Sequence, residues 1–244
     1  MLLACVVIII CSSNKNPGEN KKAGSVTINF INTVKKVPLV LDSAAYSNPF
    51  GEVYHVSKLK YYISNIKLNN QQHSFAEPNS YHLIDAGEPA SLHFTIDATA
   101  SNYNSISFMV GVDSIKNVSG AQSGALDPAN GMFWTWNSGY VMFKLEGNSP
   151  ASTIINHRIE YHIGGFSGPD NVLQVITLPL PSPLTVNEGK HTEIVVAADI
   201  DKLWHGAGNL KIAETPATMT PGALSKKIAD NYNRMFTIKE VLNK

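Results

Sequence analysis

The stretch Gly111–Gly147, GVDSIKNVSGAQSGALDPANGMFWTWNSGYVMFKLEG, decides how the rest of the chain is arranged. One predicted strand ends where this stretch begins, and a second predicted strand, residues 139–147, forms its last part. Between them, residues 117–131 show no apolar period and are rich in glycine. A segment this long without regular structure is usually functional or disordered in a compact domain. We expect it to pack against the domain through Ala125, Leu126 and Met132, as compact surface loops do.

The loop ends in an aromatic cluster, Phe133-Trp134-Thr135-Trp136, which holds two of the three tryptophans. On an extended backbone Trp134 and Trp136 point to the same face, because side chains alternate with a period of two. Two interpretations remain open. The indoles either close one end of a β-sandwich, or they lie beside the loop for redox chemistry or ligand binding.

Most of the chain outward from this loop shows the alternation of half-buried strands. The longest such segment is 53–68, in which Val53, His55, Leu59, Tyr61 and Ile63 are predicted to share one face. The apolar phase then changes, which predicts a bulge near Ser64-Asn65. Many short strands without a fixed repeat predict an all-β fold, an antiparallel two-sheet β-sandwich.

The period changes near the C-terminus. Thr220 is a predicted N-cap and Pro221 a predicted first helical residue. Apolar residues then recur at helical spacing: Leu224, Ile228, Tyr232, Met235 and Phe236. The pattern predicts one C-terminal amphipathic helix, ending near Phe236 and packed on the sandwich.

Composition excludes several classes of function. Lys plus Arg equals Asp plus Glu at 19 each among 244 residues, so no basic stripe exists for nucleic acid. The sequence also lacks the H-E-x-x-H, C-x-x-C, P-loop and Rossmann patterns. Nothing supports hydrolysis beyond the presence of serines. We therefore expect a binding protein rather than an enzyme.

Both cysteines, Cys5 and Cys11, lie at the N-terminus, which begins MLLACVVIIIC. This apolar run is shorter than the ~20 residues that span a bilayer and is typical of an export signal. We expect residues 1–11 to be a lipoprotein signal with Cys11 as the lipidated residue, 12–24 a flexible tether and 25–240 one domain. Cys5 and an unlipidated signal peptide are the alternatives. The predicted location is the cell envelope, with a lipid anchor, in the periplasm or on the outer-membrane surface.

Histidines are the main candidates for metal binding. His55 is expected on the inner strand face, as a core histidine or a ligand. His162 lies on the strand face opposite Ile159, Tyr161 and Ile163, just before Gly164-Gly165. Glycines there allow another backbone or an ion to approach closely. The loop carboxylates Asp113 and Asp127 could instead hold Ca²⁺.

Several segments together resemble the MbnP-like copper-binding family. They are 117–122, 124–128, 131–140, Leu59-Lys-Tyr-Tyr-Ile-Ser-Asn65, Tyr161-His-Ile-Gly-Gly165, Met219-Thr-Pro-Gly222 and Ile228-Ala-Asp-Asn-Tyr232. They follow one another in the family's order over residues 26–240.

The resemblance implies an exported bacterial protein in which a tryptophan is oxidised to kynurenine by a di-haem cytochrome c peroxidase-like partner and helps to bind copper. It makes Trp134 or Trp136 the modified residue and His162 a ligand. Cu(I) accepts imidazole and thioether ligands, so Met219 or Met132 could complete the site. The opposing hypothesis is a metal-free β-sandwich lipoprotein that acts as a scaffold through residues 117–131.

Overall fold

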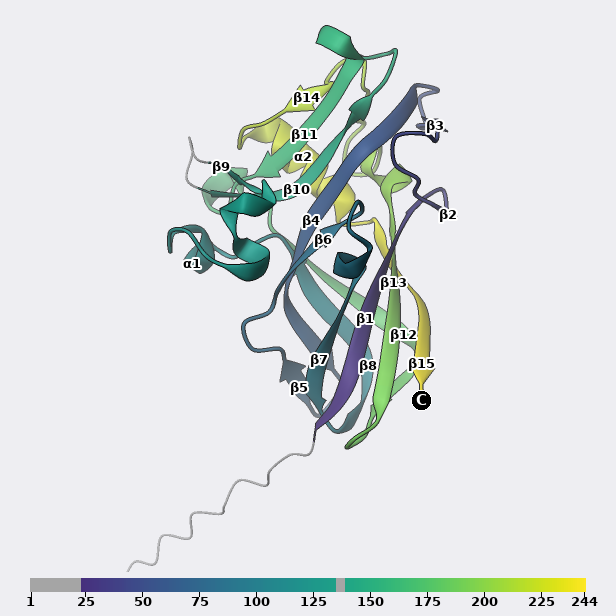
Figure 1. The fold of residues 1–244 in the computed structure, drawn as a ribbon, viewed down its shortest axis with the longest axis vertical. Coiled ribbons are helices and arrows are strands. Elements are labelled where there is room, and N and C mark those ends of the chain that lie inside the picture. The colour runs from purple at the N-terminus through teal and green to yellow at the C-terminus, as the bar shows by residue number, and fades with distance from the viewer. Residues whose placement is uncertain (1–22, 135–138) are drawn as a thin grey trace, which may run out of the picture.

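The fold is known from a computed structural model, which describes residues 23–134 and 139–244. Two β-sheets pack against each other, with one regular helix at one end (Figure 1). This confirms the predicted all-β sandwich. The predictions for Cys5, Cys11 and Trp136, and for the signal and most of the tether, fall outside the described residues.

The strands alternate with short helical turns along the chain. The strands are β1 (Ala23–Val34), β2 (Val37–Pro38), β3 (Tyr46–Ser47), β4 (Val53–Asn69), β5 (Ser74–Ala76), β6 (Tyr81–Asp85), β7 (His93–Thr99), β8 (Ser101–Val110), β9 (Phe133–Trp134), β10 (Gly139–Asn148), β11 (Arg158–Gly164), β12 (Gln174–Val186), β13 (His191–Asp199), β14 (Ala217–Thr218) and β15 (Phe236–Asn243). The helices are α1 (Ser114–Asn117) and α2 (Ala223–Tyr232), with 3₁₀ turns η1 (Pro89–Leu92), η2 (Gly124–Leu126), η3 (Pro128–Asn130), η4 (Ile155–His157), η5 (Gly168–Asp170) and η6 (Ile200–Leu203).

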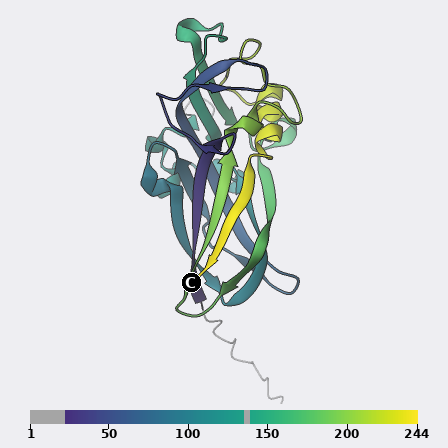
Figure 2. The same cartoon turned by 90° about the vertical axis from the view of Figure 1, so that its right-hand side faces the viewer.

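The smaller sheet has five strands, in the order β15-β13-β1-β2, with β7 also paired to β1. Figure 2 shows β1, β13 and β15 side by side. β1 and β13 are parallel, with Phe30 opposite Val196, whereas the sequence predicted antiparallel sheets. Parallel neighbours need a long connection. Here the chain between β1 and β13 builds most of the other sheet.

The larger sheet has ten strands, with the main order β12-β8-β4-β10-β11-β14. β4 is its centre, because its first half pairs with β10 and its second half with β8. The register shifts between Ser64 and Lys67, and Asn65 has a positive φ of 53°. This confirms the predicted bulge.

Aromatic side chains fill the space between the sheets. Phe30 of the small sheet lies 6.2 Å from Tyr61 and 6.1 Å from Phe108 of the large one, ring centre to ring centre. Beyond the small sheet, α2 and η6 cover the inner face of β10 and β11. The ring of Phe143 stacks on Tyr232 of α2 at 5.2 Å. The inner side chains of β10 and β11 are therefore buried, and the side chains of β11 that reach solvent, such as His162, lie on its outer face.

The C-terminal prediction was only partly right. α2 begins at Ala223, after Gly222 at φ 144°, and ends at Tyr232. Phe236 is the first residue of β15, which pairs with β13. The segment FTIKEVLN alternates as a strand does, and its pairing with the edge of the small sheet outweighs the helical spacing of its first residue. In the described part of the chain, α2 and the shorter helices are not long and apolar enough to cross a membrane.

The predicted inward orientation of His55 was wrong. Tyr54 and Val56 are fully buried, and His55 points to the other face. The register with β10 shifts by one residue between Val56 and Lys58. Such a shift exchanges the faces of all residues on one side of it, so the phase of Leu59 does not extend back to His55.

Candidate metal centre

The loop before β9 is packed against the domain, as predicted. Leu126 and Met132 are buried, with 4% and 0% of their surfaces exposed. The hydroxyl of Tyr62 donates to the carbonyl of Ala125 at 3.1 Å, and that of Tyr140 donates to Leu126 at 2.7 Å. The turns η2 and η3 thus rest on two tyrosines of the large sheet, which fixes the path of the chain into Trp134.

The start of the loop is fastened by Asp113. Its carboxylate caps α1 by accepting the amide of Lys116 at 3.1 Å, and it also accepts the hydroxyl of Tyr81. Burial acts to raise the pKa of Asp113, but the hydrogen bonds from Tyr81, Lys116 and Asn65 outweigh it and hold the pKa below its ordinary value. The carboxylate is therefore kept charged as a structural anchor.

Trp134 lies over a glycine of the neighbouring strand. It pairs with Gly139 of β10, and only 7% of its surface is exposed. A Cβ placed on Gly164 of β11 would lie 2.4 Å from Cζ3 of the indole. A side chain at that position would therefore displace the indole. The sequence predicted a close approach at this glycine, and the group that approaches is Trp134.

His162 lies on the same face of β11 as Gly164, since the two are separated by one residue. The imidazole is thus next to the indole of Trp134 along the strand. Its Nε2 is hydrogen-bonded to Oε1 of Glu146 at 2.9 Å, and Lys58 donates to Oε2 of that carboxylate at 2.8 Å. The hydrogen bond from His162, aided by Lys58, lowers the pKa of Glu146 to about 2. Glu146 is therefore ionised at neutral pH and orients the imidazole.

Met219 completes the group at the edge of the sheet. The parallel strand β14 pairs Thr218 with Tyr161. Continuing that register by one residue places Met219 beside His162, on the same face. Its side chain is 37% exposed. The register thus puts His162 two residues from Gly164, over which Trp134 lies, and puts Met219 one residue beyond the last pair of β14.

A buried lysine connects this face with the end of the loop. Lys144 pairs with His162 across β10 and β11, and its ammonium group donates to the carbonyl of Gly131. Only 8% of Lys144 is exposed, and burial lowers its pKa. A cavity of about 250 Å³ adjoins the indole, lined by Trp134, Phe166 and Asp170 among others but not by His162. Trp134 is accordingly reachable from outside although it is largely covered.

Other predicted ligands are not part of this group. His55 pairs with Asn148, four residues along β10 from Lys144, or about 13 Å at ~3.3 Å per residue. Met132 is enclosed in the core, and Asp127 caps η3 by accepting the amide of Ala129 at 2.8 Å. Within residues 23–134 and 139–244, no three His, Cys, Asp or Glu side chains gather as a metal cluster. The two loop carboxylates of the calcium alternative, Asp113 and Asp127, each cap a helical turn.

Sequence reasoning missed Glu146 and Lys58. In the strand GYVMFKLEG, Glu146 alternates outward between apolar neighbours, so its exposure could have been predicted. Its pairing with His162 depends on which strands are neighbours, and no local pattern carries that information.

Comparisons with known proteins agree with this fold. A family model described as MbnP matches residues 23–220. Among solved structures, MbnP from Methylosinus trichosporium superposes with a TM-score of 0.51 and 15% identity, over 91% of this chain and 99% of that one. At this identity the likeness concerns the fold alone. No curated protein sequence matches the chain.

Proposed function

Because the chain belongs to the MbnP family, we propose that it is a copper-binding protein of the bacterial cell envelope, which sequesters or delivers the metal and catalyses no reaction itself. One observation carries the proposal. The imidazole of His162 is held by the carboxylate of Glu146 at 2.9 Å, two residues along β11 from Gly164, over which the indole of Trp134 lies. A histidine held by a carboxylate is the usual arrangement around a protein-bound metal.

The residues present fit copper(I) by the chemistry of their donor atoms. The Nε2 atom of His162 is used by Glu146, which leaves Nδ1 to bind the metal. Met219 supplies an exposed thioether, and Cu(I) accepts both imidazole and thioether donors. Copper bound here would have neutral donors, an imidazole and a thioether. The negative charge of Glu146 would lie on the far side of the imidazole, at its Nε2 atom.

We further propose that Trp134 is converted to kynurenine by a di-haem cytochrome c peroxidase-like partner. Dioxygen, or two equivalents of peroxide, reacting at the partner's haems would cleave the Cγ–Cδ1 bond of the indole. Hydrolysis would then release Cδ1 as formate and leave an aryl amine, a nitrogen donor on the side of His162. Access favours Trp134, because a cavity of about 250 Å³ adjoins it. Trp136, outside the described residues, is the second candidate. Intact mass of protein from its native host tests this, since the product has one carbon fewer and one oxygen more.

The proposed location rests on Cys11 as a lipidated residue at the end of the export signal. Replacement of Cys11 by serine should release the mature protein from the membrane fraction without a change in its thermal unfolding. Membrane association that persists in the Cys11→Ser protein would reject the lipid anchor and leave the copper site unaffected.

Copper binding is tested by titration of the purified apo protein with Cu(I) against a coloured chelator. We expect about one Cu(I) per chain, with most of the binding lost in His162→Ala. His73→Ala is the matched control, because His73 is an exposed residue in the turn between β4 and β5. Full binding by the His162→Ala protein would refute the ligand assignment.

A second candidate function is a metal-free binding module that acts through the loop. The observation that favours it is the exposure of two apolar side chains at the start of the loop, Ile115 within α1 at 76% and Val118 directly after it at 72%. A protein that binds no copper and whose tryptophans are unmodified in the native host would support this alternative.

A further inference from the structure

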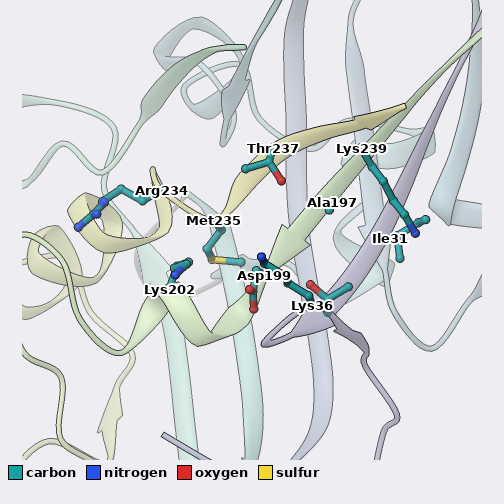
Figure 3. A pocket seen from close by; sticks show the side chains of 10 residues that line it. Ile31, Lys36, Ala197, Asp199, Lys202, Arg234, Met235, Thr237 and Lys239 are labelled. Carbon is teal, nitrogen blue, oxygen red and sulfur yellow. The ribbon is translucent and has the colours of Figure 1, made fainter. Parts of the chain in front are cut away.

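A second cavity, of about 270 Å³, lies on the outer face of the small sheet (Figure 3). Its floor follows the strand register, because Ile31 of β1 pairs with Ala197 of β13, and Ala197 pairs with Thr237 of β15. Paired residues point to the same face, so the three side chains form one row. Met235, just before β15, borders the cavity from within the core, with 0% of its surface exposed. The floor is therefore mainly apolar.

Four cationic side chains surround this floor. They are Lys36, Lys202, Arg234 and Lys239. Figure 3 shows Lys202 and Arg234 on one side of the cavity and Lys239 on the other, with Met235 between them. In the described chain, none of the four forms an ion pair with an acidic side chain. Unpaired charges gathered around one cavity favour an external anion.

The one carboxylate in the cavity wall is already engaged. Oδ1 of Asp199 accepts the backbone amides of Lys35 at 2.8 Å and of Asp201 at 3.2 Å. These bonds hold the turn after β1 and the start of η6. Asp199 thus has a structural role, and the cavity retains three more cationic than anionic groups, four against one.

An independent observation points to a missing partner. Thr33, which pairs with Asp199 and lines the cavity, is only 6% exposed. Its hydroxyl oxygen is buried and has no hydrogen-bond partner within residues 23–134 and 139–244. Leaving a buried polar group unpaired is unfavourable by ~1–3 kcal/mol. A ligand with an oxygen acceptor at this place would remove that cost.

We propose that this cavity binds a small amphipathic anion, a carboxylate or phosphate group carried on a short apolar body. The anionic group would lie among the lysines and accept a hydrogen bond from the hydroxyl of Thr33, and the apolar body would cover Ile31 and Ala197. The volume is somewhat below the ~300–1,000 Å³ of drug-sized ligand pockets, so the ligand is small. This site lies on the other sheet from His162, and its test is independent of the copper proposal.

Calorimetric titration of the purified protein with hexyl phosphate and with hexanoate tests the proposal. We expect one site per chain for at least one of them, and at least tenfold weaker binding of inorganic phosphate and of hexanol. The first control lacks the apolar body and the second lacks the charge. Binding of inorganic phosphate as tight as that of both organic anions, or no binding of either anion, would overturn the proposal.

Variants locate the site. Lys202→Gln with Lys239→Gln should weaken binding at least tenfold, whereas Lys67→Gln with Lys190→Gln, which removes the same charge from exposed positions elsewhere, should leave it within twofold. Thr33→Val keeps the shape and should weaken binding severalfold with no fall in the melting temperature. Equal weakening by the two double variants would overturn the site, because it indicates only general attraction of anions.

A vesicle experiment distinguishes the two sources of such a ligand. Binding to vesicles that contain anionic phospholipid, absent with neutral vesicles and lost in the Lys202→Gln/Lys239→Gln protein, would identify a lipid headgroup. Binding of hexyl phosphate or hexanoate without vesicle binding would identify a soluble organic acid. Both results support an amphipathic anion in this cavity. Vesicle binding that the double variant retains would contradict it.

Discussion

The histidine site on the large sheet and the cavity on the small sheet both contain charged side chains, but among the described residues these are paired at the first and unpaired at the second. On the large sheet, Lys58, Glu146 and His162 are joined by contacts of 2.8 and 2.9 Å. On the small sheet, the cations around the cavity have no acidic partner in the described chain, and Asp199 is bonded to backbone amides. Charges paired with each other fix the position of a side chain. Charges left unpaired around an apolar floor are available to an external ligand.

The largest effect is expected at Gly164 of the large sheet, because its lack of a side chain makes room for the indole of Trp134. Gly164→Ala places a Cβ about 2.4 Å from the indole, so the indole or the strand must move. We expect the free energy of unfolding to fall by about 1–3 kcal/mol, as for other overpacked sites. Chemical denaturation measures this change.

Gly87→Ala is the matched control for that substitution. Gly87 is exposed, and a Cβ there would meet its nearest neighbour, Asp85, at an ordinary 3.4 Å. Its effect should stay within about 0.5 kcal/mol. If both variants lose the same stability, the indole is not held by contact with β11.

The position of Trp134 on the large sheet also depends on Asp113, which holds the start of the loop that leads to Trp134. Its folded pKa is lowered, so its stabilising effect is present above the ordinary aspartate pKa of ~3.9 and is lost as the pH falls through the folded value. Asp113→Asn can still cap α1 but loses the charge. We expect it to be less stable than the parent by about 1 kcal/mol at pH 7.

That difference should shrink as the pH falls below 4, because the parent carboxylate then becomes protonated. Thermal unfolding of both proteins between pH 2.5 and 7 measures it. A difference that does not change over this range would show that the charge of Asp113 contributes nothing.

The smallest expected effect is a change in stability that has a different sign when a lysine is removed from the large sheet and from the small sheet. Lys58→Gln removes a partner of Glu146 and should lower stability by about 0.2–1 kcal/mol in low salt. Lys239→Gln removes one of four clustered, unpaired cations, so stability should stay the same or rise slightly. Both effects should diminish in 1 M salt, where charges are screened within ~3 Å. Equal losses in the two variants would mean that Lys239 has an intramolecular partner after all.

Local patterns predicted most of the fold. Alternation located the strands, and the phase change after Ile63 located the bulge at Asn65, because both depend only on residues close in sequence. The predictions failed where pairing between distant strands decides the secondary structure or the face of a residue. Phe236 fits a helical period and a strand period alike, and only the free edge of β13 selects the strand. The face of His55 depends on a register shift against β10, which the sequence of β4 does not reveal.

The two sites differ in how much of each could be predicted. His162, Trp134 and Met219 lie within the segments that resemble the family, and the outward phase of His162 follows from its strand. The cavity on the small sheet has no sequence signal, since its four cations come from three segments that are distant in sequence, at Lys36, at Lys202 and at Arg234 to Lys239. The pairing of β13 with β1 on one side and with β15 on the other brings them together.

The central claim, that His162 and Met219 hold copper on the outer face of β11, is tested most directly by X-ray absorption of the Cu(I)-loaded protein. We predict both nitrogen and sulfur neighbours of the metal. Met219→Leu conserves volume and should remove the sulfur signal alone, and His162→Ala should remove most of the bound metal. A copper spectrum without sulfur in the parent protein, together with full metal loading of His162→Ala, would contradict the claim.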